Sequence, residues 1–166
     1  AVNALHQANG EKREESNGLL KSGGYLPVSV DLPLVVGIPA GYIPGQSLRL
    51  QLYRRMANIE DVDELDQLID EFTDRFGPPV EEVNNLFYQL RVKLLAARAG
   101  FVSITLEGDQ IVMRFPQLPG GTGSRELPWV GPQIRAGRNA YWMKVDLDHL
   151  AWKDELLATL NVIIQT

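Results

Sequence analysis

A cluster of acidic residues is the feature of this sequence that most resembles a metal-binding or catalytic site. Asp61, Asp63, Glu64 and Asp66 lie close together, and such carboxylates bind Ca²⁺ or Mg²⁺, the second of which would support an enzyme. A calcium loop needs ligands at alternating positions and glycine at the sixth, but positions 65 and 66 are Leu and Asp. The segment also has a helical pattern, which spreads its carboxylates around a cylinder. We therefore predict no metal site and no catalytic residues.

A glycine cluster at residues 119–124 suggests a phosphate-binding loop. Such a loop needs a lysine to reach the phosphates and a serine or threonine after it, and no lysine follows this cluster at the required spacing. The dinucleotide-binding pattern also fails, because Glu126 stands where its third glycine is required. We interpret the cluster as part of a hairpin or linker, and we expect no cofactor in this chain.

Cysteine and histidine chemistry is largely excluded. The chain has no cysteine, so disulfides, thiolate metal sites and cysteine nucleophiles cannot form. Its two histidines, His6 and His149, are far apart in the sequence, which disfavours a histidine metal site or catalytic dyad. Three tryptophans at positions 129, 142 and 152 would suit a binding surface, but aromatic residues on strands and amphipathic helices are more often buried, so we expect them in the core.

Arg49, Arg54 and Arg55, together with Tyr53, are the candidates for a nucleic-acid or RNA-polymerase contact. Affinity for nucleic acid comes mostly from many neutralised phosphates, and three arginines on a chain of net charge −5 are a small footprint. We favour the interpretation that these arginines pair with the acidic helix that follows, and we keep nucleic-acid binding as the alternative.

The net charge is concentrated in one segment. Residues 61–77 contain one cation and seven acids, which gives −6, more than the −5 of the whole chain. Asp66, Asp70 and Asp74 follow one another at intervals of four, so on a helix they form one like-charged ridge that costs stability. Arg75, four residues after Glu71, relieves part of this. The residues alone leave two interpretations open: a solvated face, or a docking surface for a basic partner.

Hydrophobic periodicity predicts an α+β fold. Apolar stripes at helical spacing indicate helices around residues 46–58, 61–76, 79–99 and 152–164. Asp61 and Glu64 resemble a capping box at the start of the second helix. A hairpin is expected at residues 101–106 and 111–115, an edge or broken strand within 28–36, and further strands near 127–130 and 141–145, in a mostly loop-like stretch from 116 to 140. We expect the helices to pack on a small antiparallel sheet.

The chain is expected to comprise one domain and a tail. Residues 1–24 are polar and glycine-containing, which is typical of a linker or tail from a preceding domain, and residues 25–166 form a single α+β domain. The chain begins at Ala1 without methionine, which suggests a fragment of a longer protein. No apolar run reaches the roughly 18 residues of a membrane span and no signal peptide is visible, so we expect a cytoplasmic protein without a membrane partner.

Several short strings of residues indicate a protein family more specifically than composition or periodicity does. Their order and spacing resemble the C-terminal domain of the bacterial transcription-repair coupling factor, most closely over about residues 28–105. The strings are Val30–Leu34, Ile38–Pro39, Tyr42–Pro44, Leu48–Arg55 and Asp74–Pro78.

The resemblance implies a non-catalytic regulatory domain. The family protein is an ATP-driven DNA translocase that removes stalled RNA polymerase and recruits the excision-repair protein UvrA. Its motor, with its ATP and Mg²⁺, would lie outside this chain. The C-terminal domain would pack on an N-terminal module similar to the repair protein UvrB, mask the UvrA-binding surface and restrain the motor.

The resemblance also assigns the docking surface. In the family the end of the acidic helix faces basic residues of the UvrB-like module, and the matching residues here are Glu71, Asp74 and Arg75, with Asp70 in support. Phe72 and Thr73 replace the usual Leu-Ile pair of the family. The resemblance thus favours a docking surface over a merely solvated face.

Overall fold

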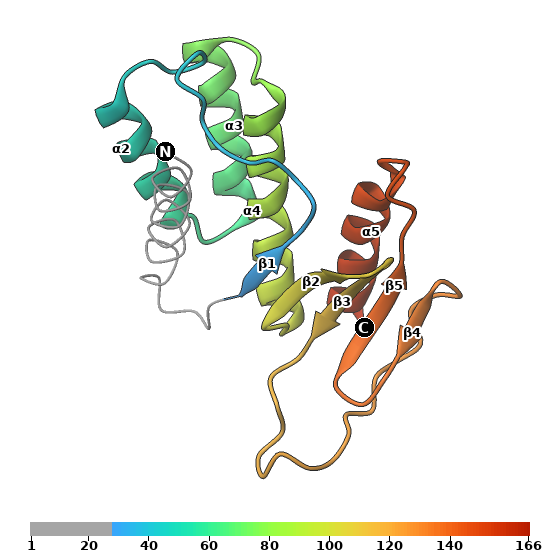
Figure 1. The fold of residues 1–166 in the computed structure, drawn as a ribbon. Coiled ribbons are helices and arrows are strands. Elements are labelled where there is room, and N and C mark those ends of the chain that lie inside the picture. The colour runs from blue at the N-terminus through green and yellow to red at the C-terminus, as the bar shows by residue number, and fades with distance from the viewer. Residues whose placement is uncertain (1–27) are drawn as a thin grey trace, which may run out of the picture.

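A computed structural model describes residues 28–166 of the chain, so the linker or tail expected at residues 1–24 lies outside the described part. Helices and strands follow one another in a mixed order, and the predicted α+β class is confirmed (Figure 1). The helices are α2 (Gln46–Ala57), α3 (Val62–Phe76), α4 (Glu81–Ala99) and α5 (Ala151–Gln165). The strands are β1 (Ser29–Asp31), β2 (Ser103–Glu107), β3 (Gln110–Arg114), β4 (Ile134–Ala136) and β5 (Ala140–Lys144).

The strands form one five-stranded sheet in the order β1-β2-β3-β5-β4. Three of its strand pairs are antiparallel, as predicted, but β1 lies parallel to β2. A parallel neighbour requires a long crossover, and here the crossover contains α2, α3 and α4. The sheet is therefore mixed.

Proline explains where the strand predictions differ from the structure. The strand expected within residues 28–36 is reduced to the three residues of β1, just before Pro33, because proline cannot donate to a strand ladder. The strand expected near residues 127–130 is absent; this segment includes Pro128, and the edge strand β4 forms at Ile134–Ala136 instead. Leu127 and Val130 still pack against the core.

Two apolar clusters lie on either side of α4. One joins α4 to α2 and α3, and we call this part the helical half. The other joins α4 to α5 and the sheet, and we call it the sheet half. Figure 1 shows α4 running between the two. Val83, Phe87 and Leu90 of α4 belong to the first cluster, whereas Val92 and Leu95 belong to the second. The same helix therefore contributes side chains to both cores.

A buried side-chain amide of α4 links the segment after β1 to α5. The Asn85 side chain is only 7% exposed. Its amide donates to the Val35 carbonyl (3.0 Å), and its oxygen accepts from Lys153 Nζ of α5 (3.2 Å). The Tyr88 hydroxyl donates to the Lys153 carbonyl (2.8 Å), and burial raises the pKa of Tyr88. The polar atoms at this junction are thus satisfied, as buried polar groups must be.

The three tryptophans occupy different environments. Trp152 of α5 is 3% exposed and belongs to the core, as predicted. Trp142 is half-buried on the sheet face opposite the core. Trp129, in the segment between β3 and β4, is 75% exposed, so the prediction that it is buried was wrong. No helix of the described residues is long and apolar enough to span a membrane.

Gly137 provides a test of how β4 packs on β5. A Cβ atom at position 137 would lie 2.2 Å from Cζ3 of Trp142, so the indole covers the space that a side chain would need. We expect Gly137→Ala to lower the free energy of unfolding by about 1–2 kcal/mol, measured by chemical denaturation, because the ring must shift. Gly41→Ala is the matched control: no atom lies within 4 Å of its Cβ position, and it should be neutral. Equal effects of the two substitutions would contradict this account of the packing.

Candidate functional site

Helix α3 is held in place by its own sequence. At its start the Asp61 carboxylate accepts the Glu64 backbone N–H (2.8 Å), as the capping pattern predicted. The Glu64 carboxylate accepts a hydrogen bond from the backbone N–H of Glu60 (3.2 Å). In a capping box it would accept from the N–H of the N-cap residue, Asp61. Leu65, Leu68 and Phe72 are buried, and this fixes which side of α3 faces solvent.

The C-terminal end of α3 is also fixed. Gly77 ends the helix at φ +84°, and its N–H donates to the Thr73 carbonyl (3.0 Å). The Tyr42 hydroxyl donates to the Gly77 carbonyl (2.8 Å). The ring of Phe76 packs edge-on against Tyr42 and Phe72. The last turn, on which the predicted docking residues lie, therefore has a defined position on the helical half.

Glu71 is neutralised within the domain. Its carboxylate lies 2.5 Å from the Arg55 guanidinium of α2 and 3.1 Å from that of Arg75. The hydrogen bond from Arg55, reinforced by Arg75, holds the pKa of Glu71 below its usual value. Arg75 also stacks over the Phe76 ring, 4.9 Å from its centroid. Glu71 thus acts first as a link between α2 and α3.

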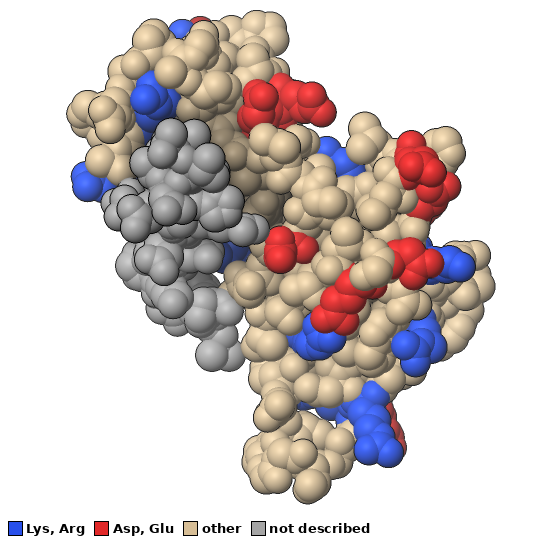
Figure 2. Space-filling model, in the orientation of Figure 1, with Lys and Arg blue, Asp and Glu red and all other residues tan. Residues whose placement is uncertain are grey.

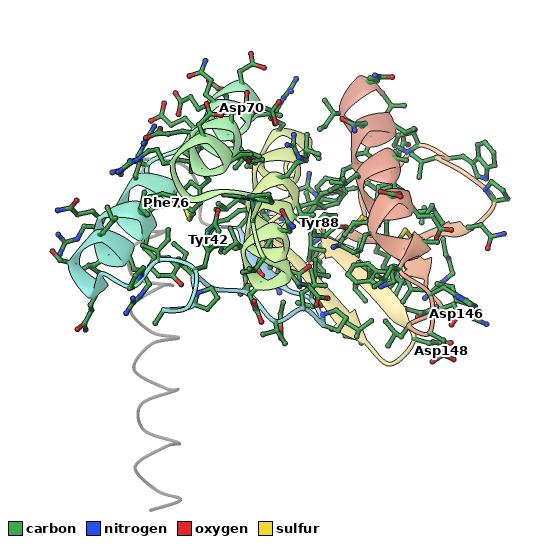
Figure 3. The ribbon with its side chains drawn as sticks, turned by 90° about the horizontal axis from the view of Figure 1, so that it is seen from above. Tyr42, Asp70, Phe76, Tyr88, Asp146 and Asp148 are labelled. Atoms are coloured by element: carbon green, nitrogen blue, oxygen red, sulfur yellow. The ribbon has the colours of Figure 1, made fainter. Side chains whose placement is uncertain are left out.

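Two residues of the predicted ridge keep their charge uncompensated. Asp70 and Asp74 are exposed, and no cation of the described residues pairs with either. Asp66, the first residue of the ridge, pairs with Arg91 of α4 (2.5 Å). Figure 3 shows Asp70 at the outer edge of α3, away from the sheet half. The structure therefore brings Asp70, Glu71, Asp74 and Arg75 onto one end of α3, but only the two aspartates present a free negative charge.

The arginines proposed for nucleic-acid contact are mostly engaged within the domain. Arg49 donates to the carbonyls of Ile43 (2.7 Å) and Pro44 (3.0 Å), and Arg55 pairs with Glu71 as the favoured interpretation predicted. Arg54 is exposed and has no ion pair within residues 28–166. Sequence reasoning missed Arg91 as a partner of the ridge, because 25 residues separate it from Asp66 and no local spacing connects them.

Metal binding would require several ligand side chains to converge within residues 28–166. No group of three or more His, Asp or Glu side chains there is placed to hold a metal ion. Asp61 and Glu64, two of the carboxylates considered above, are occupied in capping backbone N–H groups. The interpretation of these residues as helix-capping and surface groups therefore accounts for their positions.

The Glu71 link predicts a dependence of stability on pH. Because the pKa of Glu71 is lowered in the fold, its contribution is fully present above its unfolded pKa and disappears as the pH falls through the folded pKa. We expect Glu71→Gln to lower the free energy of unfolding by about 0.5 kcal/mol at neutral pH, the size of a largely exposed ion pair. The difference from the unmodified chain should vanish in acid, which denaturant titrations at several pH values would measure.

Asp74→Asn is the matched control for this prediction. It removes a carboxylate that has no ion-pair partner within residues 28–166 and that lies near the C-terminal end of a helix, where the helix dipole disfavours anions. It should leave stability unchanged or raise it. A loss equal to that of Glu71→Gln would show that the Arg55–Glu71 pair is not what stabilises this end of α3.

Known proteins resemble this chain in sequence and in fold. The family model of the TRCF domain matches residues 32–121. The transcription-repair-coupling factor of Rickettsia prowazekii is 33% identical over 111 residues, which is 63% of this chain and 10% of that protein. The same factor of Mycobacterium bovis is 36% identical over 89 residues, 54% of this chain and 7% of that protein. The chain thus spans about a tenth or less of the length of these curated relatives.

A solved structure supports the same assignment at the level of the fold. It is described as the C-terminal domain of transcription-repair coupling factor, and it superposes with a TM-score of 0.69 at 16% sequence identity, covering 84% of this chain and 92% of that one. The family model covers 90 of the 166 residues, from 32 to 121. The chain therefore belongs to the TRCF domain family.

Proposed function

We propose that this chain is a non-catalytic regulatory domain of an ATP-dependent DNA translocase that couples transcription to nucleotide-excision repair. In this proposal it docks on a UvrB-like N-terminal module of the same protein, masks the surface that UvrA binds and restrains the motor. ATP, Mg²⁺, DNA and RNA polymerase would be bound by other parts of that protein, which would act in the cytoplasm. The TRCF family membership supports the setting, and the surface of α3 supports the docking step.

The observation that carries the proposal is the uncompensated charge of Asp70 and Asp74. Both carboxylates lie on the C-terminal half of α3, where the helix dipole and their mutual repulsion destabilise them. A basic partner surface would remove this penalty, since charge-assisted hydrogen bonds contribute about 1.5–3 kcal/mol each before desolvation is counted. The fixed end of α3, held by Tyr42 and Gly77, reduces the ordering that docking would require.

Glu71 and Arg75 have a different role in the proposal from the two aspartates. Their ion pair with Arg55 sets the position of the last turns of α3. Arg75, half of whose side chain is exposed, remains able to donate to a carboxylate of the partner. Asp70 and Asp74 would then supply the attraction to the UvrB-like module, while Glu71 and Arg75 orient the surface.

Regulation would follow from a shift between two populations. While the docked state is favoured, the surface for UvrA is covered; any event that weakens the contact with α3 raises the share of the open state. A change of about 1.4 kcal/mol in the docking free energy alters the ratio of open to docked molecules about tenfold. Modest electrostatic contacts are therefore sufficient for control.

The test uses a transcription-repair coupling factor that carries this domain together with its UvrB-like module. We expect the double substitution Asp70→Lys and Asp74→Lys to tighten the apparent binding of UvrA about tenfold or more, measured by titration with labelled UvrA, because the docked state loses its attraction. The ATPase rate should rise in the same variant as the motor is released.

Asp148→Lys with Glu155→Lys is the matched control, since it makes the same charge change at exposed positions near and within α5 in the sheet half. Docking through α3 predicts no effect of this control. Unchanged UvrA binding in the Asp70 and Asp74 variant, or equal effects of both double substitutions, would overturn the proposal.

A further inference from the structure

The chain leaves the sheet half after β1 and returns to it at nearly the same place. The Val35 carbonyl accepts the Asn85 side-chain amide (3.0 Å), and the Gly37 N–H donates to the Glu82 carbonyl (3.2 Å). Both acceptor and donor of α4 lie in its first turns. Residues 38–80, which contain α2 and α3, therefore form an insertion whose two ends meet at the start of α4 (Figure 1). We call these residues the helical insertion.

The helical insertion is bonded mostly to itself. The Tyr53 hydroxyl of α2, for example, accepts the N–H of Ile38 (2.7 Å). Its side-chain ion pair with the rest of the domain, from Asp66 to Arg91, reaches only α4. Within residues 28–166 no hydrogen bond or ion pair joins the helical insertion to the sheet or to α5, and among residues 38–80 only Val62 packs against the apolar cluster of the sheet half.

The sheet half has its own contacts with α4. The Tyr88 hydroxyl donates to the Lys153 carbonyl (2.8 Å), and the Asn85 oxygen accepts from Lys153 Nζ (3.2 Å). The Trp152 ring packs edge-on against Tyr88, and Leu95 lies in the cluster of the sheet half. These contacts involve α5 and the sheet, so none of them depends on the positions of α2 and α3.

The two cores differ in size. The cluster of the helical half contains ten buried residues, and that of the sheet half contains sixteen. Helix α2 buries only Leu52 and Met56 and begins without a side-chain cap. On the side in view in Figure 2, a notch separates the outer part of the helical half from the sheet half. Because burial of apolar surface is the main source of stability, the helical insertion is held less firmly than the sheet half.

We infer that the helical insertion opens as one cooperative unit, in which α2 and α3 leave α4 together while the sheet half stays folded. Proteins open in contiguous units whose opening free energies lie below that of global unfolding. The helical insertion is contiguous, and its ends are held together at Gly37 and Glu82. Opening exposes Val83 and Phe87 of α4 to water, and this cost keeps the closed state dominant.

The opening controls whether the acidic end of α3 exists as a surface. Asp70 and Asp74 lie within the helical insertion, so they have defined positions only while it is closed. A partner that docks on them binds the closed state and shifts the population toward it. This consequence rests on the docking proposal, whereas the opening itself does not.

The first test is native-state hydrogen exchange of the 166-residue chain, followed by mass spectrometry. Amides of α2 and α3 should exchange through one common opening, about 20-fold or more faster than amides of β2, β3 and α5 after correction for intrinsic rates. Equal opening free energies for the two halves, or different ones for α2 and α3, would contradict the inference.

Two matched substitutions make the exchange test sharper. Ile104→Val in the core of the sheet half should speed exchange of the sheet about fivefold and leave α2 and α3 unchanged, because the sheet half is intact in both the closed and the opened states. Ile43→Val in the core of the helical insertion should speed exchange of both halves about fivefold, since global unfolding includes the opening. Equal acceleration of every amide by Ile104→Val would show a single cooperative unit.

The second test forces the helical insertion open. Phe72→Asp places a carboxylate at a position that is 0% exposed. The three tryptophans, at positions 129, 142 and 152, all lie in the sheet half, so their fluorescence reports on that half alone. The variant should lose the helical circular dichroism of α2 and α3 and keep a cooperative fluorescence transition in denaturant. Loss of that transition would overturn the inference. Neither test involves UvrA, so both can succeed where the docking test fails.

Discussion

The burial of α4 on two sides is the constraint on which the rest of this structure depends. Val83 and Phe87 pack in the core of the helical half, and Val92 and Leu95 pack in the core of the sheet half. An exposed helix would show one apolar stripe, but α4 is apolar on more than one side because the two clusters pack on different sides of it. The position of α3 follows from this, since Leu68 and Phe72 pack in the cluster that α4 completes. The sheet is placed in the same way, through the cluster on the other side of α4.

Elements with strong local patterns could be predicted from the sequence, and contacts between distant residues could not. The stripe of α3 and its cap at Asp61 depend on neighbours within a few residues, so spacing alone located them. The β4 strand has only three residues at an edge and no alternation long enough to recognise. The ion pairs from Glu71 to Arg55 and from Asp66 to Arg91 join different helices. Whether a ridge of acids is neutralised therefore depends on tertiary packing, and this is why sequence charge alone left two interpretations open.

The distribution of ion pairs changes what the net charge of −5 means. Pairing within the fold compensates Asp66 and Glu71 of α3, and in the C-terminal half of that helix it leaves Asp70 and Asp74 without an ion pair among residues 28–166. On the sheet half, aromatic rings and neutral acceptors hold Arg125 and Arg135 without cancelling their charge. The sheet half carries acids as well, and residues 101–166 together hold six Lys or Arg and seven Asp or Glu.

The parallel pairing of β1 with β2 has a mechanical consequence. The described chain enters the domain at residue 28 and passes directly into β1, whose register with β2 places Ser29 opposite Ser103. Tension along the backbone at that point would load the β1–β2 hydrogen bonds together, in shear, instead of opening them one after another. The load would reach the sheet and α4 first, and α3 lies beyond the crossover. Force transmitted through the chain at β1 would thus act first on the hydrogen bonds between β1 and β2 in the sheet half.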